Sequence, residues 1–281
     1  MVTVVFFYDI MRAEEKMLLE KLRERATVEV VHTTSTPLRI GEPPVEADSA
    51  LARGVSGTAA FYASVAAESW GLPVVNPSRG MAIARDKAWS QAVLAASGVP
   101  TPQGSIVVDA RVIPEAAGIH GYPAVVKPVR GSWGRLVSIV RDEIEAHMVS
   151  EHRQYMASDA FKTNVVQEYI RKPDRDARLF CIDGRIAAAI YRIGGGFVAT
   201  NIAQGARAEP LKPPAEMEEI AVKACTSLGL DVGGVDVIED PERGYMVLEV
   251  NPSPEFKTTV RVTGVDVPGL IVDLVVSKAR R

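Results

Sequence analysis

The stretch of sequence that decides the fold is Gly234-Val235-Asp236-Val237-Ile238, then Asp240-Pro241-Glu242-Arg243-Gly244, then Tyr245-Met246-Val247-Leu248-Glu249-Val250-Asn251. The outer segments have the β-branched, apolar composition of strands, and the middle segment has the composition of a turn. We therefore predict a β-hairpin that places Asp236 beside Glu249 and Asn251. Oxygen ligands of this kind suit Mg²⁺, which usually binds substrate phosphates as well. The hairpin thus predicts a magnesium and nucleotide site, with a solvated pair of acids as the alternative.

A phosphate-binding region is expected upstream of this hairpin. The segment Tyr122-Pro123-Ala124-Val125-Val126-Lys127-Pro128 is typical of a buried strand that ends at Lys127, because a proline cannot continue a central ladder. The next segment, Arg130-Gly131-Ser132-Trp133-Gly134-Arg135, is a short loop bracketed by glycines. Its backbone N–H groups suit phosphate oxygens, and its glycines suit a lid that closes when a nucleotide binds. The loop is neither a Walker A motif nor a Gly-x-Gly-x-x-Gly fingerprint, and a plain β-hairpin loop is the alternative.

A third segment is predicted to leave one domain for another. Val165-Val166-Gln167-Glu168-Tyr169-Ile170 is typical of a strand, and Arg171-Lys172-Pro173-Asp174 follows it as a connector. The edge of such a strand offers backbone donors and acceptors to an adenine. Asp176, just downstream, is then expected to bind the ribose hydroxyls.

These segments, taken together and in this order, resemble the ATP-grasp carboxylate-amine ligases. Within that superfamily the chain is similar to the RimK-like branch, above all to ligases of the LysX type, which join α-aminoadipate to the small carrier protein LysW. The matches that carry this resemblance are Gly131-Ser132-Trp133-Gly134-Arg135-Leu136, Ala188-Ala189-Ile190-Tyr191-Arg192, Glu255-Phe256-Lys257-Thr258-Thr259 and Thr263-Gly264-Val265-Asp266-Val267-Pro268-Gly269. The resemblance runs along essentially the whole chain. It implies an α/β ATP-grasp fold with three units: an N-terminal, Rossmann-like parallel-sheet domain (1–85), a central domain (86–168) and a C-terminal domain (169–281).

The resemblance also implies roles for individual residues. Those expected to bind ATP are Lys87, Lys127, Gly131, Ser132, Trp133, Gly134, Arg135, Gln167, Glu168, Tyr169, Ile170 and Asp176. Those expected to bind the amino-acid substrate are Arg192, Asn201, Phe256, Lys257 and Thr258, and the catalytic set is Lys127, Arg192 and Asn201. Those expected to hold Mg²⁺ are Asp236, Glu249 and Asn251. An arginine such as Arg192 binds a carboxylate through a bidentate fork, which suits a dicarboxylic amino acid; an ion-paired strand arginine is the alternative.

The expected reaction is ATP-dependent amide formation. ATP converts the side-chain carboxylate of the carrier's C-terminal glutamate to an acyl phosphate, which the amino group of α-aminoadipate or glutamate then attacks. Two segments depart from the LysX pattern: Asn201-Ile202-Ala203-Gln204-Gly205-Ala206 and Asn251-Pro252-Ser253-Pro254. The amino substrate is therefore left open between α-aminoadipate, glutamate and both. Two further interpretations are a RimK-like glutamate ligase with another protein or small-molecule acceptor, and a nucleotide-binding regulatory module without ligase activity.

Composition is consistent with these expectations. The 281 residues are 47% hydrophobic and 24% charged, as in a globular protein. Cys181 and Cys225 lack metal or redox spacing and are expected to be ordinary buried thiols. The net charge of −3 gives no case for nucleic acid, and the opening segment Val2–Phe7 is too short for a membrane anchor. We expect a cytoplasmic homo-oligomer.

The N-terminal unit is expected to alternate strands and helices, which predicts a parallel sheet. The expected strands are 2–7, 27–31 and 73–75, and the expected helices are 14–25, 57–68 and, in the next unit, 86–96. A carrier with an acidic tail further predicts a basic mouth around the glycine loop and the connector. Its candidate residues are Arg130, Arg135, Arg171, Lys172, Arg175 and Arg178.

Overall fold

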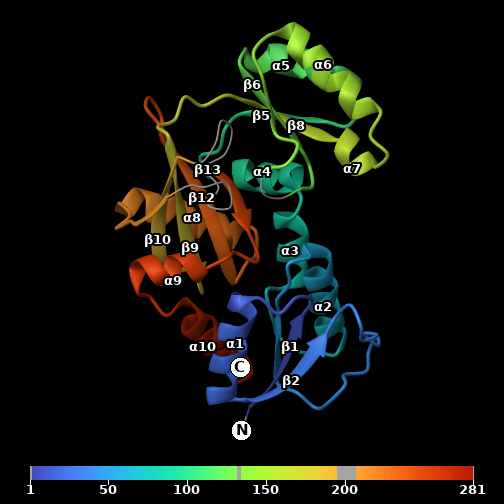
Figure 1. Ribbon diagram of the computed structural model, residues 1–281, viewed down its shortest axis with the longest axis vertical. Coiled ribbons are helices and arrows are strands. Elements are labelled where there is room, and N and C mark those ends of the chain that lie inside the picture. The colour runs from blue at the N-terminus through green and yellow to red at the C-terminus, as the bar shows by residue number, and fades with distance from the viewer. Residues whose placement is uncertain (1, 132–133, 195–206, 281) are drawn as a thin grey trace.

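A computed structural model describes residues 2–131, 134–194 and 207–280, and within them the chain forms three β-sheets (Figure 1). The strand order is β2-β1-β3-β4 in the first sheet, β5-β8-β6-β7 in the second and β11-β10-β9-β12-β13 in the third. Figure 1 shows the first sheet at the end of the molecule that carries the N-terminus and the second sheet at the opposite end. No helix in these described ranges is long and apolar enough to cross a membrane.

The N-terminal unit alternates strands and helices as the sequence predicts, and its sheet is parallel throughout. Its elements are β1 (Thr3–Tyr8), α1 (Ala13–Arg25), β2 (Thr27–His32), β3 (Ser49–Ala52), α2 (Gly57–Ser69), β4 (Val74–Val75) and α3 (Ser78–Ala84). The sequence analysis did not predict β3, whose short run of small residues carries little periodic signal. In a parallel sheet the carboxyl ends of neighbouring strands share one edge. Asp9 and Arg53 therefore follow β1 and β3 at the same edge.

The central unit carries an antiparallel sheet covered by helices. Its elements are α4 (Lys87–Ala96), β5 (Gly104–Val107), a 3-10 turn (Ala110–Val112), α5 (Ile113–His120), β6 (Ala124–Pro128), β7 (Ser138–Val140), α6 (Glu143–Gln154), α7 (Asp159–Lys162) and β8 (Asn164–Glu168). The Asp86 side chain accepts hydrogen bonds from the N–H groups of Ala88 and Trp89 at 3.1 and 3.0 Å, which explains why α4 begins at Lys87.

The C-terminal unit carries the largest of the three sheets, which is antiparallel. Its elements are β9 (Arg175–Ile182), β10 (Arg185–Ile193), β11 (Arg207–Pro210), α8 (Ala215–Ser227), β12 (Val232–Asp240), β13 (Gly244–Asn251), α9 (Lys257–Thr263) and α10 (Val267–Lys278). Cys181 and Cys225 are both buried free thiols here, as expected.

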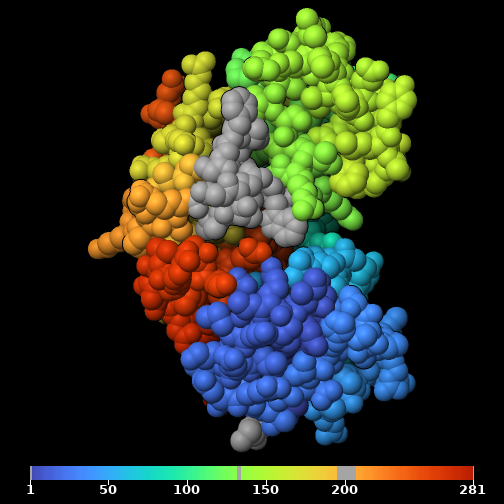
Figure 2. Space-filling model, in the orientation of Figure 1, coloured from blue at the N-terminus to red at the C-terminus, as the bar shows by residue number. Residues whose placement is uncertain are grey.

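The first and last units share one hydrophobic core. Helix α10 packs against α1, and buried residues of β1 and α1 belong to the same cluster as Phe180, Phe256 and Val272. Figure 2 shows the blue N-terminal residues against the red C-terminal residues at one end of the molecule and the green central unit at the other. The C-terminal helix therefore ties the third unit to the first, although they are distant in sequence.

Candidate active site

A pocket of about 620 Å³ lies where the three units meet, which is in the size range of small-molecule sites. The N-terminal unit contributes Arg12, Gly54 and Arg85 to its wall; the central unit contributes Lys87 and Lys127, and the C-terminal unit contributes, among others, Arg192, Asp236, Glu249, Asn251, Lys257 and Thr258. The pocket thus gathers several residues that the sequence analysis assigned to ATP, metal and substrate.

The acidic hairpin is formed as predicted. Asp236 of β12 lies opposite Glu249 of β13, and Gly234 lies opposite Asn251, with a register shift between Asp236 and Val237. The two acids differ in environment, because the side chain of Asp236 is 8% exposed and that of Glu249 is 45% exposed. The hairpin therefore brings one buried and one accessible carboxylate, with the Asn251 amide two residues further on, to one wall of the pocket.

Asp236 already has strong partners in the structure. Arg178 of β9 forms a two-pronged pair with its carboxylate, and Arg192 of β10 lies 3.0 Å from Oδ2. Burial alone would raise the pKa of Asp236, but the two guanidinium groups lower it below its ordinary value. The carboxylate is therefore anionic near pH 7, which suits a cation ligand.

Arg192 is also paired with Asp176, with Nε 2.6 Å from Oδ1. Burial acts to lower the pKa of Arg192, whereas Asp236 and Asp176 raise it above its ordinary value. Asp176, which the sequence analysis assigned to the ribose, is thus a buried partner of Arg192 that lies at the pocket wall. Its role toward the ribose stays a prediction.

The two lysines expected to bind phosphate lie close to the same acids. Lys87 Nζ donates to the Gly131 carbonyl at 2.7 Å and lies 4.0 Å from Glu249 Oε2. Burial lowers the pKa of Lys127 to about 8, with Lys87 acting in the same direction and Glu249 and Asp236 acting against it. Lys127 is therefore a cation near pH 7 that has lost much of its hydration, and an anionic ligand would stabilise its charge.

The glycine loop connects β6 to β7, and these two strands pair antiparallel. Its described residues Arg130, Gly131, Gly134 and Arg135 line the pocket. Ser132 and Trp133 lie outside the described residues, so the predicted lid is not tested. Asn201 and the departures Gln204 and Ala206 also lie outside them.

The hinge residues are placed differently from the lysines, since none of Gln167, Glu168, Tyr169 and Ile170 lines this pocket. The Glu168 carboxylate accepts from the backbone N–H of Gln103 at 2.8 Å and from two guanidinium nitrogens of Arg243 at 2.9 and 3.0 Å. Contact between these hinge residues and an adenine stays a prediction.

The predicted substrate residues are split between pocket and core. Lys257 and Thr258 line the pocket at the start of α9. Phe256 is completely buried, and the guanidinium of Arg53 lies 5.5 Å from the centre of its ring. The side chain of Phe256 therefore packs in the core, and its proposed contact with substrate is not supported by this placement.

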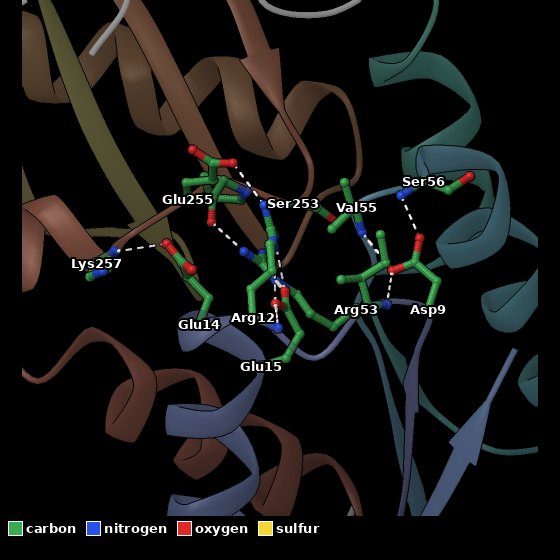
Figure 3. Close-up of polar contacts among 12 residues, drawn as sticks. Asp9, Arg12, Glu14, Glu15, Arg53, Val55, Ser56, Ser253, Glu255 and Lys257 are labelled. Carbon is green, nitrogen blue, oxygen red and sulfur yellow. Dashed lines mark hydrogen bonds and ion pairs between the residues drawn. The ribbon is translucent and has the colours of Figure 1, made fainter. Parts of the chain in front are cut away.

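Sequence reasoning missed a polar network that joins the N-terminal unit to the loop after β13 (Figure 3). Arg53 donates to the Pro254 carbonyl at 2.7 Å and to Glu15 at 3.3 Å, and Arg12 pairs with Glu255 at 2.8 Å and with Glu15 at 3.0 Å. The position of these arginines in the sequence could have predicted the network. Arg12 and Arg53 closely follow β1 and β3, so they lie at the carboxyl edge of the parallel sheet, where ligands commonly bind.

The same loop passes very close to β12. A Cβ added at Gly234 would lie 2.6 Å from the Cβ of Pro254, so only glycine leaves room at this position. Asn76 of the N-terminal unit also donates to the Pro252 carbonyl at 2.7 Å. The departure Pro252-Ser253-Pro254 is therefore held against β12 of its own unit and against the N-terminal unit.

No group of three or more His, Cys, Asp or Glu side chains in the described ranges is arranged to hold a metal ion. A cation here would rest on the two carboxylates of the hairpin together with the amide oxygen of Asn251, which accepts from the Ser253 N–H at 2.9 Å. All three ligands are oxygens, which fits Mg²⁺ rather than zinc.

Comparison with solved structures defines the class of protein. The RimK domain ATP-grasp protein from Sphaerobacter thermophilus superposes with a TM-score of 0.77 over 98% of this chain and 100% of that one, at 24% identity, so the fold is ATP-grasp. A model of the RimK-like ATP-grasp domain matches residues 84–275, and a model of the LysX preATP-grasp domain matches residues 4–84. The chain therefore belongs to the RimK-like ATP-grasp family of ligases, whose members use ATP and Mg²⁺.

Similar proteins of known name span nearly the whole chain. The α-aminoadipate–LysW ligase LysX of Sulfolobus acidocaldarius is 34% identical, covering 94% of this chain and 97% of that protein. The glutamate–LysW ligase ArgX of Sulfurisphaera tokodaii is 32% identical, covering 97% of each. The two identities are nearly equal, so overall similarity does not choose between the two amino acids.

Proposed function

We propose that this chain is an ATP- and Mg²⁺-dependent ligase that joins α-aminoadipate, glutamate or both to the C-terminal glutamate of a small acidic LysW-like carrier protein. The observation that carries the proposal is the pocket that unites Lys87, Lys127 and the acidic hairpin in a chain similar to LysW ligases over nearly its full length. The pathway would be the biosynthesis of lysine, arginine or both, in the cytoplasm.

The residues around the pocket fit this chemistry. A carboxylate is a poor electrophile, so the carrier glutamate must become an acyl phosphate before an amine attacks. Phosphoryl transfer depends mainly on positioning and on neutralisation of charge. Lys127 and Lys87 supply positive charge beside Glu249, and burial of Lys127 strengthens its attraction to phosphate.

The hairpin residues fit a magnesium ion bound together with the nucleotide. Asp236, Glu249 and Asn251 would hold it, and Mg²⁺ bound there would screen the negative charge of the phosphates. Asp236 stays anionic because Arg178 and Arg192 lower its pKa. Glu249 is the more accessible carboxylate of the two, so it is better placed to meet an incoming ion.

The substrate amino acid would lie toward α9. Lys257 and Thr258 line the pocket there, and Arg192 lies on the same wall. Arg192 pairs with both Asp176 and Asp236 in this structure, so a substrate carboxylate would have to share its guanidinium with them. The choice between a shorter and a longer dicarboxylic amino acid would depend on the loop 252–256, on the start of α9 and on residues 201–206.

The decisive experiment is intact-protein mass spectrometry of a LysW-like carrier. The carrier is incubated with enzyme, Mg-ATP and either α-aminoadipate or glutamate, and omission of ATP is the control. We expect the carrier mass to rise by one amino-acid residue, with ADP and phosphate released. A carrier that ends one residue earlier, without its terminal glutamate, should stay unmodified. If the full carrier is never modified by either amino acid, the proposal is wrong.

We also propose that the chain forms a homo-oligomer. Light scattering coupled to size-exclusion chromatography would measure its molar mass directly. A mass equal to that of one chain, 30.3 kDa, at working concentration would contradict this part of the proposal.

A further inference from the structure

Two arginines at the pocket wall have no role in the site described above, although Arg130 is one of the residues that the sequence predicts for a basic mouth. Arg85 follows helix α3 of the N-terminal unit, and Arg130 follows strand β6 of the central unit; both line the pocket. They therefore face the same space from two different units. Neither was assigned to ATP, metal or the amino-acid substrate.

Arg85 is held firmly in place. Its Nη2 donates to the Thr58 hydroxyl at 2.8 Å, and its guanidinium lies 5.6 Å from the centre of the Phe61 ring. A Cβ added at Gly57 would approach Arg85 Nε to 2.9 Å, so the absence of a side chain at Gly57 makes room for it. A guanidinium fixed in this way loses little conformational entropy when it binds a ligand.

The charge of Arg85 is not balanced by an acid. Within the part of the chain that the structure describes, neither Arg85 nor Arg130 forms an ion pair with a carboxylate. Burial lowers the pKa of Arg85, and the positive charge of Arg130 lowers it further. Two neighbouring cations repel each other, and a bound anion between them would remove that cost.

Other basic residues near the pocket are already paired or hydrogen-bonded. Arg175 pairs with Glu239 at 2.9 Å, Arg178 pairs with Asp236, and Lys172 donates to the carbonyls of Pro173 and Arg175. Three of the six residues expected to form the basic mouth thus donate hydrogen bonds to partners within the protein. Arg130, which also belongs to the predicted mouth, and Arg85 of the N-terminal unit both line the pocket without a carboxylate partner among the described residues.

We propose that Arg85 and Arg130 form a carboxylate-binding subsite for the acidic C-terminal tail of the protein acceptor. This inference rests on the proposed function, because it names residues that would recognise that acceptor. The phosphates of the nucleotide already have Lys87, Lys127 and the hairpin to meet them, so Arg85 and Arg130 remain available to a different anion, such as the acceptor tail. Guanidinium groups bind carboxylates through paired hydrogen bonds, which suits a tail of glutamates and aspartates.

The test measures binding of a fluorescent synthetic peptide that ends in glutamate and carries several further acidic residues. Its dissociation constant is measured by anisotropy for wild type, Arg85→Ala, Arg130→Ala and Arg85→Lys. The matched control is Arg79→Ala, which removes an exposed arginine of the same helix that does not line the pocket. ATP binding is measured in parallel, and thermal denaturation checks that each variant is folded.

We expect Arg85→Ala and Arg130→Ala to weaken peptide binding about tenfold or more, as is typical of lost charged hydrogen bonds. Arg79→Ala should leave it unchanged, and Arg85→Lys should recover part of the loss. Moderate salt should weaken peptide binding to wild type more than to Arg85→Ala. The affinity for ATP should be nearly the same in all folded variants.

Three results would overturn the subsite. They are a loss of ATP affinity with peptide binding intact, which would assign the arginines to phosphate; an equal effect of Arg79→Ala, which would indicate only general charge; and no effect of either pocket arginine. Failure of the proposed function gives a different result. In that case the wild-type enzyme modifies no carrier, although Arg85→Ala still weakens peptide binding. If the carrier is modified and its Michaelis constant is the same in Arg85→Ala, the subsite alone fails.

Discussion

Glu249 and Asp236 lie opposite each other on β13 and β12, but they differ in burial and in the number of cations that neutralise their charge. Asp236 is buried and paired with two arginines, whereas the Glu249 side chain is 45% exposed and lies 4.0 Å from Lys87. Of the two carboxylates, Glu249 is therefore the one whose charge is available to a metal-bound nucleotide. Its removal should affect chemistry more than folding.

We predict that Glu249→Gln lowers kcat about a hundredfold or more while the protein stays folded. The change removes one formal charge at nearly constant size, and groups that stabilise developing charge commonly contribute this much to rate. Glu242→Gln, an exposed position in the turn of the same hairpin, is the control and should behave as wild type. Wild-type turnover with an unchanged Mg²⁺ dependence in Glu249→Gln would show that this assignment is wrong.

Lys127 gives a prediction about pH. Because its pKa is lowered to about 8, the side chain is charged below that value and neutral above it, so ATP affinity should fall as pH rises through about 8. An anionic ligand raises the pKa of a lysine, so ATP binding near pH 8 should take up protons. Calorimetry in buffers of different ionisation enthalpy measures this uptake directly.

Two variants of Lys127 separate charge from structure. Lys127→Ala should weaken ATP binding at neutral pH, and Lys127→Arg should bind ATP with little dependence on pH over this range, since arginine stays protonated. The free energy of unfolding depends on pH in the opposite direction from ATP affinity. Between about pH 8 and the ordinary lysine pKa, Lys127 is mostly neutral in the folded state and mostly protonated in the unfolded chain. The free energy of unfolding therefore rises with pH in that window. ATP affinity that is flat from pH 7 to 9.5 in wild type would contradict the role of this lysine.

At the scale of elements, the β12–β13 turn is fastened to the end of strand β8. Arg243 in the turn pairs with Glu168 at 2.9 Å and with Asp240 at 2.7 Å. These contacts join the C-terminal sheet to the central sheet next to the predicted hinge. The pair is partly exposed, so solvent weakens it.

We predict that Arg243→Ala lowers the free energy of unfolding by about 1 kcal/mol, because it removes a bidentate pair whose Glu168 is mostly buried. Hydrogen exchange at the end of β8 should become faster. Arg111→Ala, which removes the exposed pair with Asp109, is the control and should change stability much less. Equal exchange rates in wild type and Arg243→Ala would argue against the fastening.

At the scale of the whole molecule, the N-terminal unit supports the wall of the pocket next to α9. Arg53 is 5% exposed and lies between Glu15, the Pro254 carbonyl and the ring of Phe256. The loop after β13 leads directly into Lys257 and Thr258 at the start of α9. The first unit is therefore a structural part of the site and does not merely adjoin it.

We predict that Arg53→Ala lowers the free energy of unfolding by about 3 kcal/mol, since it breaks a buried ion pair and leaves Glu15 with fewer partners. The Michaelis constant for the amino-acid substrate should rise more than that for ATP, because the loop after β13 loses its anchor. Urea denaturation and steady-state kinetics measure the two effects. Arg39→Ala, at an exposed pair in the same unit, is the control. Unchanged kinetics in Arg53→Ala would show that the anchor does not position the loop.

The sequence alone determined the local features of this protein. Alternating apolar segments predicted β1, β2, β4, α1 and α2 of the N-terminal unit, though not β3 or α3, and the turn at 240–244 predicted the hairpin that pairs Asp236 with Glu249. Pro128 predicted that a strand ends at Lys127; β6 ends one residue later, at Pro128 itself. These features were predictable because the residues that determine them are neighbours in the chain.

Only the tertiary structure decided which elements lie side by side. Asp236 meets Arg178 across 58 residues of chain and Arg53 meets Pro254 across 201, and no local pattern encodes either pair. Phe256 was predicted to touch substrate, yet it packs in a core shared by the first and last units. Arg178 pairs with Asp236 because β9 lies beside β12, whereas Arg85, at the end of α3, lies at the pocket wall and has no carboxylate partner within the described ranges. Periodicity specifies the elements, but burial of their apolar faces against one another decides which charges end up together.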